Sequence, residues 1–304
     1  MSLKTILIIG SEGFIGSHLV GFYIRSGWDV IGMDLAESSK HNIQYQQFVD
    51  QDEAFEGIIQ HFSFERCVNA AGNGDVNFSV THPYEDFKAN TLLTIKLLEA
   101  LRKYAPQCKY IHISSAAVYG NPAKLPITEQ DEINPVSPYG WHKFLAEQSC
   151  IEYNKTYGLL CAIIRPFSVF GPGLRKQLLW DVYKRSHDLN GPLELWGTGA
   201  ETRDYIFIDD LIHSIDIIFD HSQMNASIYN IASGEMTSIS DIVTKLLLAL
   251  NRPNSIYFNG NILKGNPINW KADISKLKSL SYAPTVSLED GINKLAEWMK
   301  QLDQ

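Results

Sequence analysis

A turn punctuated by glycine near the start of the chain constrains the fold more than any other feature. The apolar segment 5–9 predicts a strand, and residues 17–25 predict a helix. Between them stand Gly10, Gly13 and Gly16. Gly10 permits a tight turn, Gly13 lets a phosphate approach the backbone, and Gly16 lets the helix pack closely on the strand. This order of elements predicts a doubly wound α/β fold with a nucleotide at the turn.

The next strand supports the same interpretation. Residues 29–33 predict this strand, which ends at Asp34. A carboxylate roughly 20 residues beyond the turn accepts hydrogen bonds from an adenosine ribose and repels a ribose 2′-phosphate. The helix N-terminus presents free N–H groups to the pyrophosphate. We therefore expect NAD rather than NADP as the cofactor.

The third predicted strand, residues 44–49, ends in acidic side chains. Asp50 and Asp52 are both placed to accept a hydrogen bond from the amino group of adenine. Asp52 is equally well placed to cap a helix over residues 53–61. The sequence leaves both roles open, and Asp52 is kept as a candidate cofactor contact.

Small residues end the fourth predicted strand, residues 66–71, and leave room for a cofactor against the backbone. Pro83 then begins a helix that we expect to reach residue 104, with Asn90 facing the end of the sheet. The candidate cofactor contacts in this part of the chain are Ala70, Ala71, Gly72 and Asn90.

The fifth predicted strand, residues 110–113, ends in hydroxyl groups that include Ser115, as when a buried parallel strand delivers polar groups to the open end of a sheet. Ser137 then fits the N-cap of a helix predicted over residues 137–157. Tyr139 and Lys143 stand four residues apart and are therefore neighbours on one face of that helix.

These side chains have a chemical use together. A phenol is a poor base at neutral pH, because its reference pKa is about 10. An ammonium beside it stabilises the phenolate and lowers that pKa. We therefore expect Ser115, Tyr139 and Lys143 to move a proton on or off a carbinol oxygen. His142, next to the lysine, we expect to be an exposed helical residue.

Composition excludes several other classes. The 304 residues carry a net charge of -8, which argues against binding to nucleic acid or to an anionic membrane. We expect no metal and no disulfide framework, because the four cysteines are scattered without ligand spacing. The N-terminus runs straight into a strand, and no apolar run is long enough to cross a bilayer, so we expect a cytoplasmic protein.

Composition shifts after residue 171, where aromatic and basic side chains such as Arg175, Lys176 and Trp180 gather in longer loops. These three side chains either grip a diphosphate and stack on a base, or form a solvated basic surface with one aromatic side chain in the core. The predicted domains are a dinucleotide-binding domain of residues 1–171 with about 204–222, and a substrate lobe of residues 172–203 and 223–304.

Several motifs together resemble the extended short-chain dehydrogenase/reductase family, and within it the NAD-dependent nucleotide-sugar epimerase/dehydratase group. The resemblance implies a Rossmann-type doubly wound parallel sheet with a smaller C-terminal substrate lobe, a nucleotide-diphosphate sugar as substrate, and a homodimer. The motifs that carry it are GSEGFIG at 10–16, Asp34, AAG at 70–72, SSAAVYG at 114–120, YGWHK at 139–143, RPFSVFGPG at 165–173, RDYIFIDD at 203–210 and KADISK at 271–276.

The resemblance assigns roles to individual residues. It makes Ser115 the catalytic hydroxyl, Tyr139 the base and Lys143 its helper. It adds Phe14, Ile15 and Phe167 to the cofactor contacts. The implied substrate contacts are Ser115, Ser168, Arg203 and Lys264, and the composition of the loop adds Arg175.

Three of the substrate contacts either have an alternative role or differ from the residue that the family carries. Arg203 is expected at the diphosphate, with a surface ion pair to Asp204 or Glu201 as the alternative. Ser168 replaces an asparagine of the family and reaches less far. Lys264 replaces an arginine and cannot make a bidentate phosphate contact.

Two absences narrow the reaction. Ala116 and Ala117 stand where 4,6-dehydratases carry an acidic pair, and Ala117 stands where 3,5-epimerase-reductases carry a cysteine. The remaining reactions are epimerisation at carbon 4 through a transient 4-keto sugar, which we favour, and reduction of a 4-keto sugar by external NAD(P)H. A non-catalytic NAD-binding regulator on the same fold is the third alternative.

Overall fold

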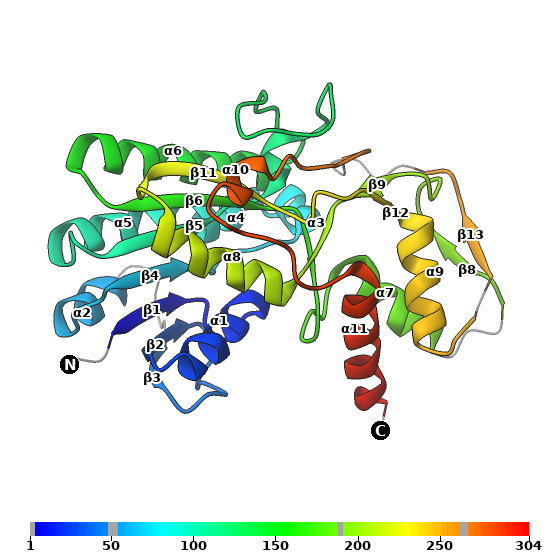
Figure 1. Cartoon of the computed structure of the whole chain (residues 1–304), viewed down its shortest axis with the longest axis horizontal. Helices are drawn as coiled ribbons and strands as arrows, with labels where there is room; N and C mark the ends of the chain where they lie inside the picture. The colour runs from blue at the N-terminus through cyan, green and yellow to red at the C-terminus, as the bar shows by residue number, and fades with distance from the viewer. Residues whose placement is uncertain (1–3, 48–53, 188–190, 254, 262–266, 304) are drawn as a thin grey trace.

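The computed structural model describes residues 4–47, 54–187, 191–253, 255–261 and 267–303. Its centre is a seven-stranded sheet in which every pair of neighbouring strands is parallel (Figure 1). This confirms the predicted doubly wound α/β class. The strands in order across the sheet are β11 (Asn225–Ile231), β6 (Cys161–Pro166), β5 (Lys109–Ile113), β4 (Arg66–Asn69), β1 (Thr5–Ile9), β2 (Asp29–Asp34) and β3 (Gln44–Gln47).

The strand order reverses between β1 and β4, and ligands of such sheets bind at the carboxyl ends beside this point. The register places Ile9 of β1 beside Met33 of β2 and Asn69 of β4. The segments that follow these three strands therefore leave the sheet at the same level. This brings the glycine turn, Asp34 and residues 70–72 to one edge.

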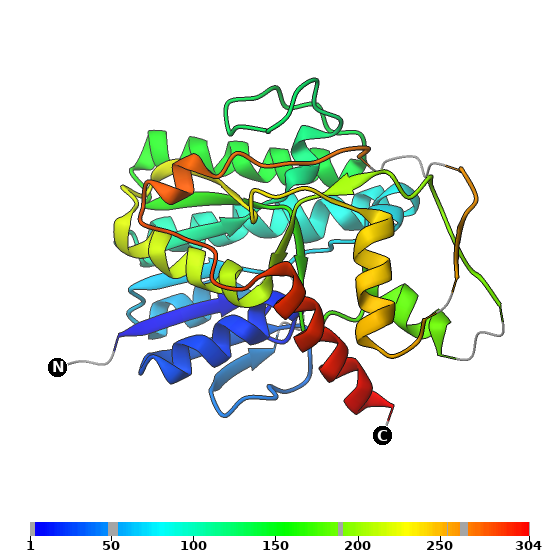
Figure 2. The same ribbon diagram turned by 45° about the vertical axis from the view of Figure 1, so that its right-hand side comes forward.

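Helices cover both faces of the sheet, and the two faces form separate apolar clusters. Figure 2 shows α6 on the upper side of the strands and α1 on the lower side. No helix in the described ranges is long and apolar enough to cross a membrane. One face is covered by α1 (Phe14–Arg25) and α8 (Ile208–His221), and the other by α2 (Ala54–His61), α5 (Leu93–Tyr104) and α6 (Pro138–Tyr157).

A π-helical turn divides the helix predicted from Pro83 to residue 104. The side chain of Asn90 donates to the carbonyl of Asp86 at 3.1 Å, and the Thr94 hydroxyl donates to the carbonyl of Asn90 at 2.7 Å. Side chains thus engage backbone carbonyls at this turn, and such turns are frequent at functional sites. The three parts are α4 (Pro83–Phe87), η1 (Lys88–Leu92) and α5.

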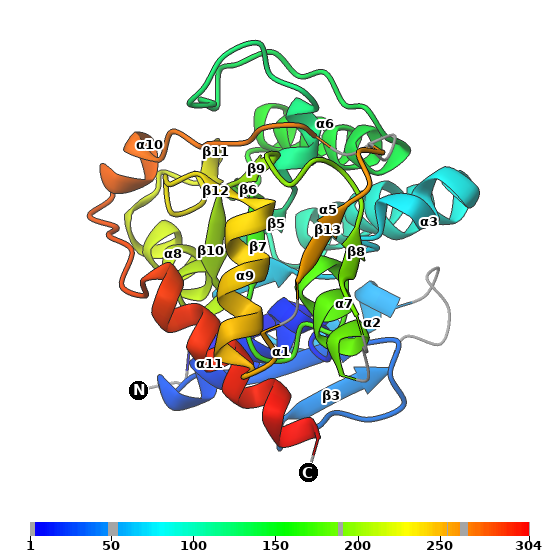
Figure 3. The ribbon, with the colours of Figure 1, turned by 90° about the vertical axis from the view of Figure 1, so that its right-hand side faces the viewer.

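A smaller group of elements lies beyond the carboxyl ends of the strands and faces the viewer in Figure 3. It contains the parallel strand pair β8 and β13, and its helices α9 and α11 pack on each other. The elements are α7 (Gln177–Ser186), β8 (Leu193–Leu195), α9 (Ile239–Ala249), β13 (Ile256–Phe258) and α11 (Leu288–Leu302).

Short elements connect the two parts, and their strands pair outside the central sheet as β7 with β10 and β9 with β12. Within residues 204–222, β10 pairs with β7 outside the central sheet, whereas α8 packs its apolar side chains on the sheet and α1. The connecting elements are β7 (Ser168–Phe170), β9 (Thr202–Arg203), β10 (Tyr205–Phe207), β12 (Thr237–Ser238) and α10 (Ser275–Lys278), and the short helices α3 (Val76–Thr81) and η2 (Ala116–Tyr119) lie between elements of the sheet domain.

Strand β11 belongs to the central sheet, although the sequence analysis assigns its residues to the smaller lobe. The composition places residues 223–304 in the smaller lobe, whereas β11 within this range pairs with β6 and completes the central sheet. All six residues of β6 are buried, and β11 supplies hydrogen-bonding partners for its backbone. The largest apolar cluster also continues from the sheet, at Ile164, into α7, α9 and α11, at Val182, Leu246 and Leu295.

Candidate active site

The glycine turn after β1 has no room for side chains. Gly10 adopts φ +79°, and a Cβ atom there would lie 2.6 Å from the backbone nitrogen of Ala71. A Cβ atom on Gly16 would lie 1.9 Å from the carbonyl oxygen of Gly10. Gly13 is the N-cap of α1 and makes no side-chain cap, so the first N–H groups of the helix, at Phe14 and Ile15, point out of it. Such a helix terminus binds phosphate.

Asp34 at the end of β2 borders the same turn. Its Oδ2 accepts a hydrogen bond from the backbone nitrogen of Glu12 at 2.8 Å, and its Oδ1 accepts one from Leu35 at 2.7 Å. A carboxylate has about four acceptor positions, so Asp34 keeps capacity for ribose hydroxyls. The Glu12 carboxylate in turn accepts hydrogen bonds from Ser39 and Lys40, which orders the loop after β2.

The segment after β4 forms the opposite wall of the turn. A Cβ atom on Gly10 would also lie 2.8 Å from the carbonyl carbon of Ala70, and the backbone nitrogen of Ala71 donates to Asn69 Oδ1 at 3.1 Å. Gly72 adopts φ +131°, and a Cβ atom there would lie 2.5 Å from Asn90 Oδ1. The structure therefore brings the predicted contacts of residues 70–72 and Asn90 together. Asp52 lies outside the described residues.

The hydroxyl, phenol and ammonium come from two elements at the same edge. Ser115 follows β5 and caps η2, with its Oγ accepting from the Ala117 nitrogen at 3.1 Å. Helix α6 begins as predicted, because Ser137 Oγ accepts from the Gly140 nitrogen at 3.2 Å. The first turns of α6 carry Tyr139 and Lys143, and the ammonium lies 5.9 Å from the centre of the phenol ring.

Burial dominates the electrostatics of this group. It raises the pKa of Tyr139 to about 12, a rise that a hydrogen bond with Ser115 offsets in part and that the Asp86 charge increases. Burial also lowers the pKa of Lys143 to about 8, against the charges of Asp86 and Glu147. Without a cofactor the pKa of Tyr139 is thus shifted upward, with burial as the largest cause, and the lowering expected from Lys143 stays a prediction.

A buried ion pair fixes the two elements behind the site. Arg165 of β6 donates to both carboxylate oxygens of Glu147 on α6, at 2.9 and 2.6 Å. The Ser114 hydroxyl donates to the same carboxylate at 2.5 Å. Since Glu147 lies one helical turn beyond Lys143, this network sets the position of α6 relative to the ends of β5 and β6.

The predicted substrate residues lie in different surroundings. Arg203 is half-buried and donates to the carbonyl oxygens of Thr202 and Ile268 at 2.8 and 3.1 Å. Its guanidinium lies 5.6 Å from the ring centre of Trp270. The alternative of an ion pair is not supported, because Glu201 accepts from Thr198 and Gly199, and Asp204 from Ser233, Gly234 and Ala272.

Arg175 is exposed and packs its guanidinium against Trp180 of α7 and Trp298 of α11, at 5.9 and 5.8 Å from the ring centres. Ser168 begins β7 and is half-buried. Lys264 lies outside the described residues.

Phe167 lies between the rings of Tyr119 and Trp270 and is 7% exposed. Its side chain belongs to an apolar cluster, so a cofactor contact at this position would have to come from its backbone.

Two residues of this region are missed by sequence reasoning. His142 is not an exposed helical residue, since its Nδ1 donates to the fully buried carboxylate of Asp86 at 2.6 Å. The two residues lie on different helices, α6 and α4, and no local pattern connects them.

Within the described part of the chain, no cluster of three or more His, Cys, Asp or Glu side chains is placed to hold a metal ion.

The glycine turn fits a dinucleotide, because a Cβ atom at Gly10 or Gly16 would fill it and the helix terminus offers N–H groups to phosphate. The buried Oδ1 of Asn90 has no partner among the described residues and is a free acceptor at the same edge. A switch-point dinucleotide cradle beside a Ser–Tyr–Lys set defines a nucleotide-dependent enzyme of the short-chain dehydrogenase/reductase type.

Comparison with known proteins gives the family. The model of the NAD dependent epimerase/dehydratase family matches residues 6–232, and the chain belongs to this family. The resemblance inferred from the motifs is confirmed, and so is NAD as the cofactor. A protein of Methanocaldococcus jannaschii named putative UDP-glucose 4-epimerase is 31% identical and covers 97% of this chain and 98% of its own.

Solved structures agree with this assignment. The UDP-glucuronic acid 4-epimerase of Bacillus cereus, in complex with UDP-glucuronic acid and NAD, is 29% identical with a TM-score of 0.88, covering 98% of this chain and 100% of that chain. The UDP-glucose 4-epimerase of Thermotoga maritima, with UDP-glucose, is 27% identical with a TM-score of 0.91, covering 99% and 100%.

Proposed function

We propose that this protein is an NAD-dependent epimerase that inverts carbon 4 of a nucleotide-diphosphate sugar through a transient 4-keto sugar. The observation that carries the proposal is the convergence of Ser115, Tyr139 and Lys143 at the sheet edge that also holds the glycine turn. Relatives that align over almost the whole chain are named as 4-epimerases of UDP-sugars, so we propose a UDP-sugar as the substrate.

The cofactor would be held by the backbone of the glycine turn at its pyrophosphate and by Asp34 at its adenosine ribose. Residues 70–72 and Asn90 would border it from the other side. The chemistry that NAD supplies when bound is reversible hydride transfer at carbon 4 of the sugar.

The protein's own residues handle the proton. Tyr139 as phenolate accepts the proton of the 4-hydroxyl, while Ser115 donates a hydrogen bond to the same oxygen. The phenolate needs positive charge nearby, because burial raises the pKa of Tyr139 to about 12. The ammonium of Lys143 supplies one such charge, and the oxidised nicotinamide ring carries another. Tyr139 returns the proton once the keto-sugar has turned over.

Ala116 and Ala117 in η2 cannot shuttle a second proton, which favours epimerisation over dehydration. On the substrate side, Ser168, Arg175 and Arg203 are proposed contacts to the diphosphate. Of these, Arg203 has the more favourable surroundings, since it is half-buried beside Trp270.

We further propose a homodimer formed through α5 and α6. The exposed apolar side chains on α6 are Trp141 at 49%, Leu145 at 42% and Tyr157 at 52%, and α5 ends in Tyr104, which is 38% exposed. A cytoplasmic location is proposed because all four cysteines are free thiols buried in the core, a state that a reducing compartment preserves.

The experiment starts with identification of the nucleotide that the purified protein carries. The protein is then incubated, without added cofactor, with UDP-glucose, UDP-glucuronic acid or UDP-N-acetylglucosamine that carries deuterium at carbon 4. A 4-epimer that retains the deuterium, formed by protein with bound NAD, is the expected result. Turnover only of a 4-keto sugar with added NAD(P)H would favour the reductase, and inertness with NAD bound would favour the regulator.

A further inference from the structure

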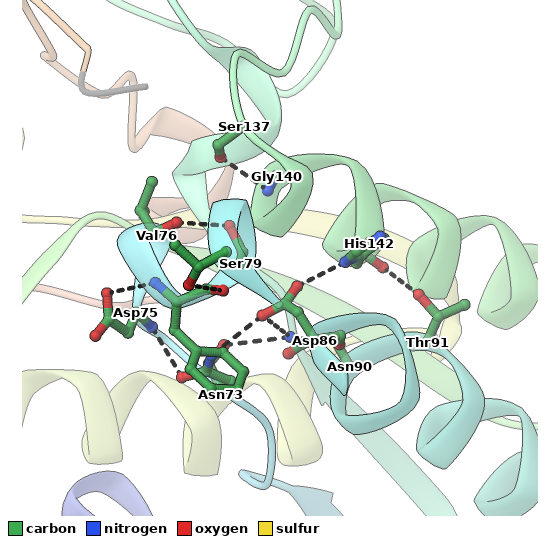
Figure 4. Close-up of polar contacts among 12 residues, drawn as sticks. Asn73, Asp75, Val76, Ser79, Asp86, Asn90, Thr91, Ser137, Gly140 and His142 are labelled. Atoms are coloured by element: carbon green, nitrogen blue, oxygen red, sulfur yellow. Dashed lines mark hydrogen bonds and ion pairs between the residues drawn. The ribbon is translucent and has the colours of Figure 1, made fainter. Parts of the chain in front are cut away.

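A buried carboxylate behind the site has no role in the chemistry described so far. Asp86, at the end of α4, is fully buried. It accepts hydrogen bonds from His142 Nδ1 at 2.6 Å, Asn90 Nδ2 at 3.1 Å and Asn73 Nδ2 at 3.3 Å (Figure 4). One carboxylate thus joins α6, the π-turn and the loop after β4, the elements that carry Lys143, Asn90 and Gly72.

This carboxylate determines which end of the Asn90 amide faces the site. A carboxylate only accepts hydrogen bonds, so the NH₂ end must face Asp86. The same NH₂ also donates to the carbonyl oxygens of Asp86 and Asn73 at 3.1 and 3.3 Å. Oδ1 therefore faces the opposite way. A Cβ atom on Gly72 would lie 2.5 Å from this oxygen and 3.4 Å from Lys143 Nζ.

Both atoms that border Gly72 keep hydrogen-bonding capacity. Asn90 Oδ1 is buried and has no partner among the described residues. An ammonium has three donors, and Lys143 Nζ donates one of them to the Ile113 carbonyl at 3.0 Å. The charged and titratable groups that face this ammonium are Asp86 of α4, Glu147 and Tyr139 of α6, His112 of β5 and Lys176 before α7.

We propose that Asp86 and His142 are a pair of positioning residues that hold the Asn90 amide with its oxygen toward Lys143 and the cofactor. His142 fixes the carboxylate from α6, the helix that also carries Tyr139 and Lys143. The charge of Asp86 acts on the ammonium in addition to orienting the amide. This inference rests on the proposed function, because it assigns the pair to the same site.

The main test replaces Asp86 by asparagine in the NAD-loaded protein. Asp86→Asn keeps the shape but removes the charge, and its own NH₂ can face Asn90, which allows the Asn90 amide to turn over. We expect kcat to fall about ten-fold with KM within two-fold. We also expect the alkaline limb of the kcat profile to move about one pH unit lower, because the ammonium of Lys143 loses a nearby negative charge.

A second pair of variants tests the histidine. His142→Asn keeps an N–H donor near the position of Nδ1, whereas His142→Leu removes it. We expect His142→Asn to retain wild-type kcat and pH profile, and His142→Leu to lose activity as Asp86→Asn does. Thr91→Val is the matched control, because it removes the bond from the Thr91 hydroxyl to the His142 carbonyl, 2.8 Å long, without changing charge. It should lower the melting temperature and leave the pH profile unchanged.

An independent readout separates this inference from the proposed function. ¹³C-lysine NMR of the NAD-loaded protein, assigned with Lys143→Met, reports the pKa of Lys143 directly. If the wild type lacks epimerase activity, the proposed function fails while this comparison still tests the pair. A Lys143 pKa that is the same in folded Asp86→Asn and in wild type would overturn the inference, as would full activity of His142→Leu.

Discussion

Addition of one methyl group at Gly16 should disable cofactor binding. A Cβ atom at this position would lie 1.9 Å from the Gly10 carbonyl oxygen, 2.7 Å from its carbon and 2.9 Å from Ser11 Cα. All three atoms belong to the backbone, so no side chain can rotate away. In Gly16→Ala, α1 must therefore move away from the turn by about 1.5 Å to restore ordinary contact.

The expected magnitude follows from this movement. Overpacking of this kind costs about 1–3 kcal/mol, and a rigid backbone favours the upper end. This corresponds to a fall in melting temperature on the order of 5 °C. A displaced helix terminus loses a backbone N–H bond to the pyrophosphate, and a hydrogen bond to a charged group is worth about 1.5–3 kcal/mol, which corresponds to roughly 10- to 100-fold in affinity. We therefore expect NAD affinity, measured by calorimetry on nucleotide-free protein, to fall by about that factor.

Gly57→Ala is the matched control for Gly16→Ala. Gly57 lies in α2, is exposed, and a Cβ atom there would meet nothing within 4 Å. Alanine is the better helix former by about 1 kcal/mol, so this variant should be at least as stable as the wild type and bind NAD normally. Wild-type NAD affinity and melting temperature in Gly16→Ala would refute the reasoning about the turn.

Three further predictions concern the base and two buried carboxylates. Tyr139→Phe should retain bound NAD and lose about 10³-fold or more of kcat, since proton transfer by a positioned side chain contributes on the order of 10²–10⁴-fold. Glu147→Gln should lower the free energy of unfolding by about 3–5 kcal/mol in urea titrations, because it leaves Arg165 with an uncompensated buried charge. Burial raises the pKa of Asp204 to about 6. The difference in free energy of unfolding between the wild type and Asp204→Asn should therefore shrink as pH rises from about 4 to 6, because the folded state loses its extra proton over this range.

Each of these predictions has an outcome that contradicts it. Full turnover by Tyr139→Phe would remove the assigned base. For Glu147→Gln the comparison is Lys245→Ala, which breaks an exposed ion pair to Glu289 and should cost at most about 1 kcal/mol. Equal losses in these two variants would contradict the role given to burial. A stability difference for Asp204 that grows between pH 4 and 6 would have the wrong sign, because the folded state should bind the extra proton there.

Local sequence signals predict much of the fold. The strand, glycine turn, helix and acid at Asp34 are all found, since each depends on neighbouring residues. The N-cap at Ser137 is also found, because a capping side chain bonds within its own turn. The roles of Asp52 and Lys264 stay predictions.

Features that depend on tertiary packing could not be predicted in this way. The pair of Asp86 and His142 joins two helices across 56 positions, and helical periodicity gives a face but no partner. The sequence predicts the pKa of Tyr139 from the charge of Lys143, whereas the largest influence in the structure is burial, which depends on the whole fold. Composition places β11 in the smaller lobe, whereas it pairs with β6 in the central sheet. Composition does not show which segments pair as neighbouring strands.

The apolar cluster that runs from the central sheet into α7, α9 and α11 has a practical consequence. Two parts that share one core should melt in a single transition rather than one after the other. A nucleotide sugar held between them would then stabilise the entire molecule by an amount that rises with the logarithm of its affinity. Thermal-shift screening of candidate sugars against the NAD-loaded protein can therefore rank substrates from one melting curve each, before any product is assayed.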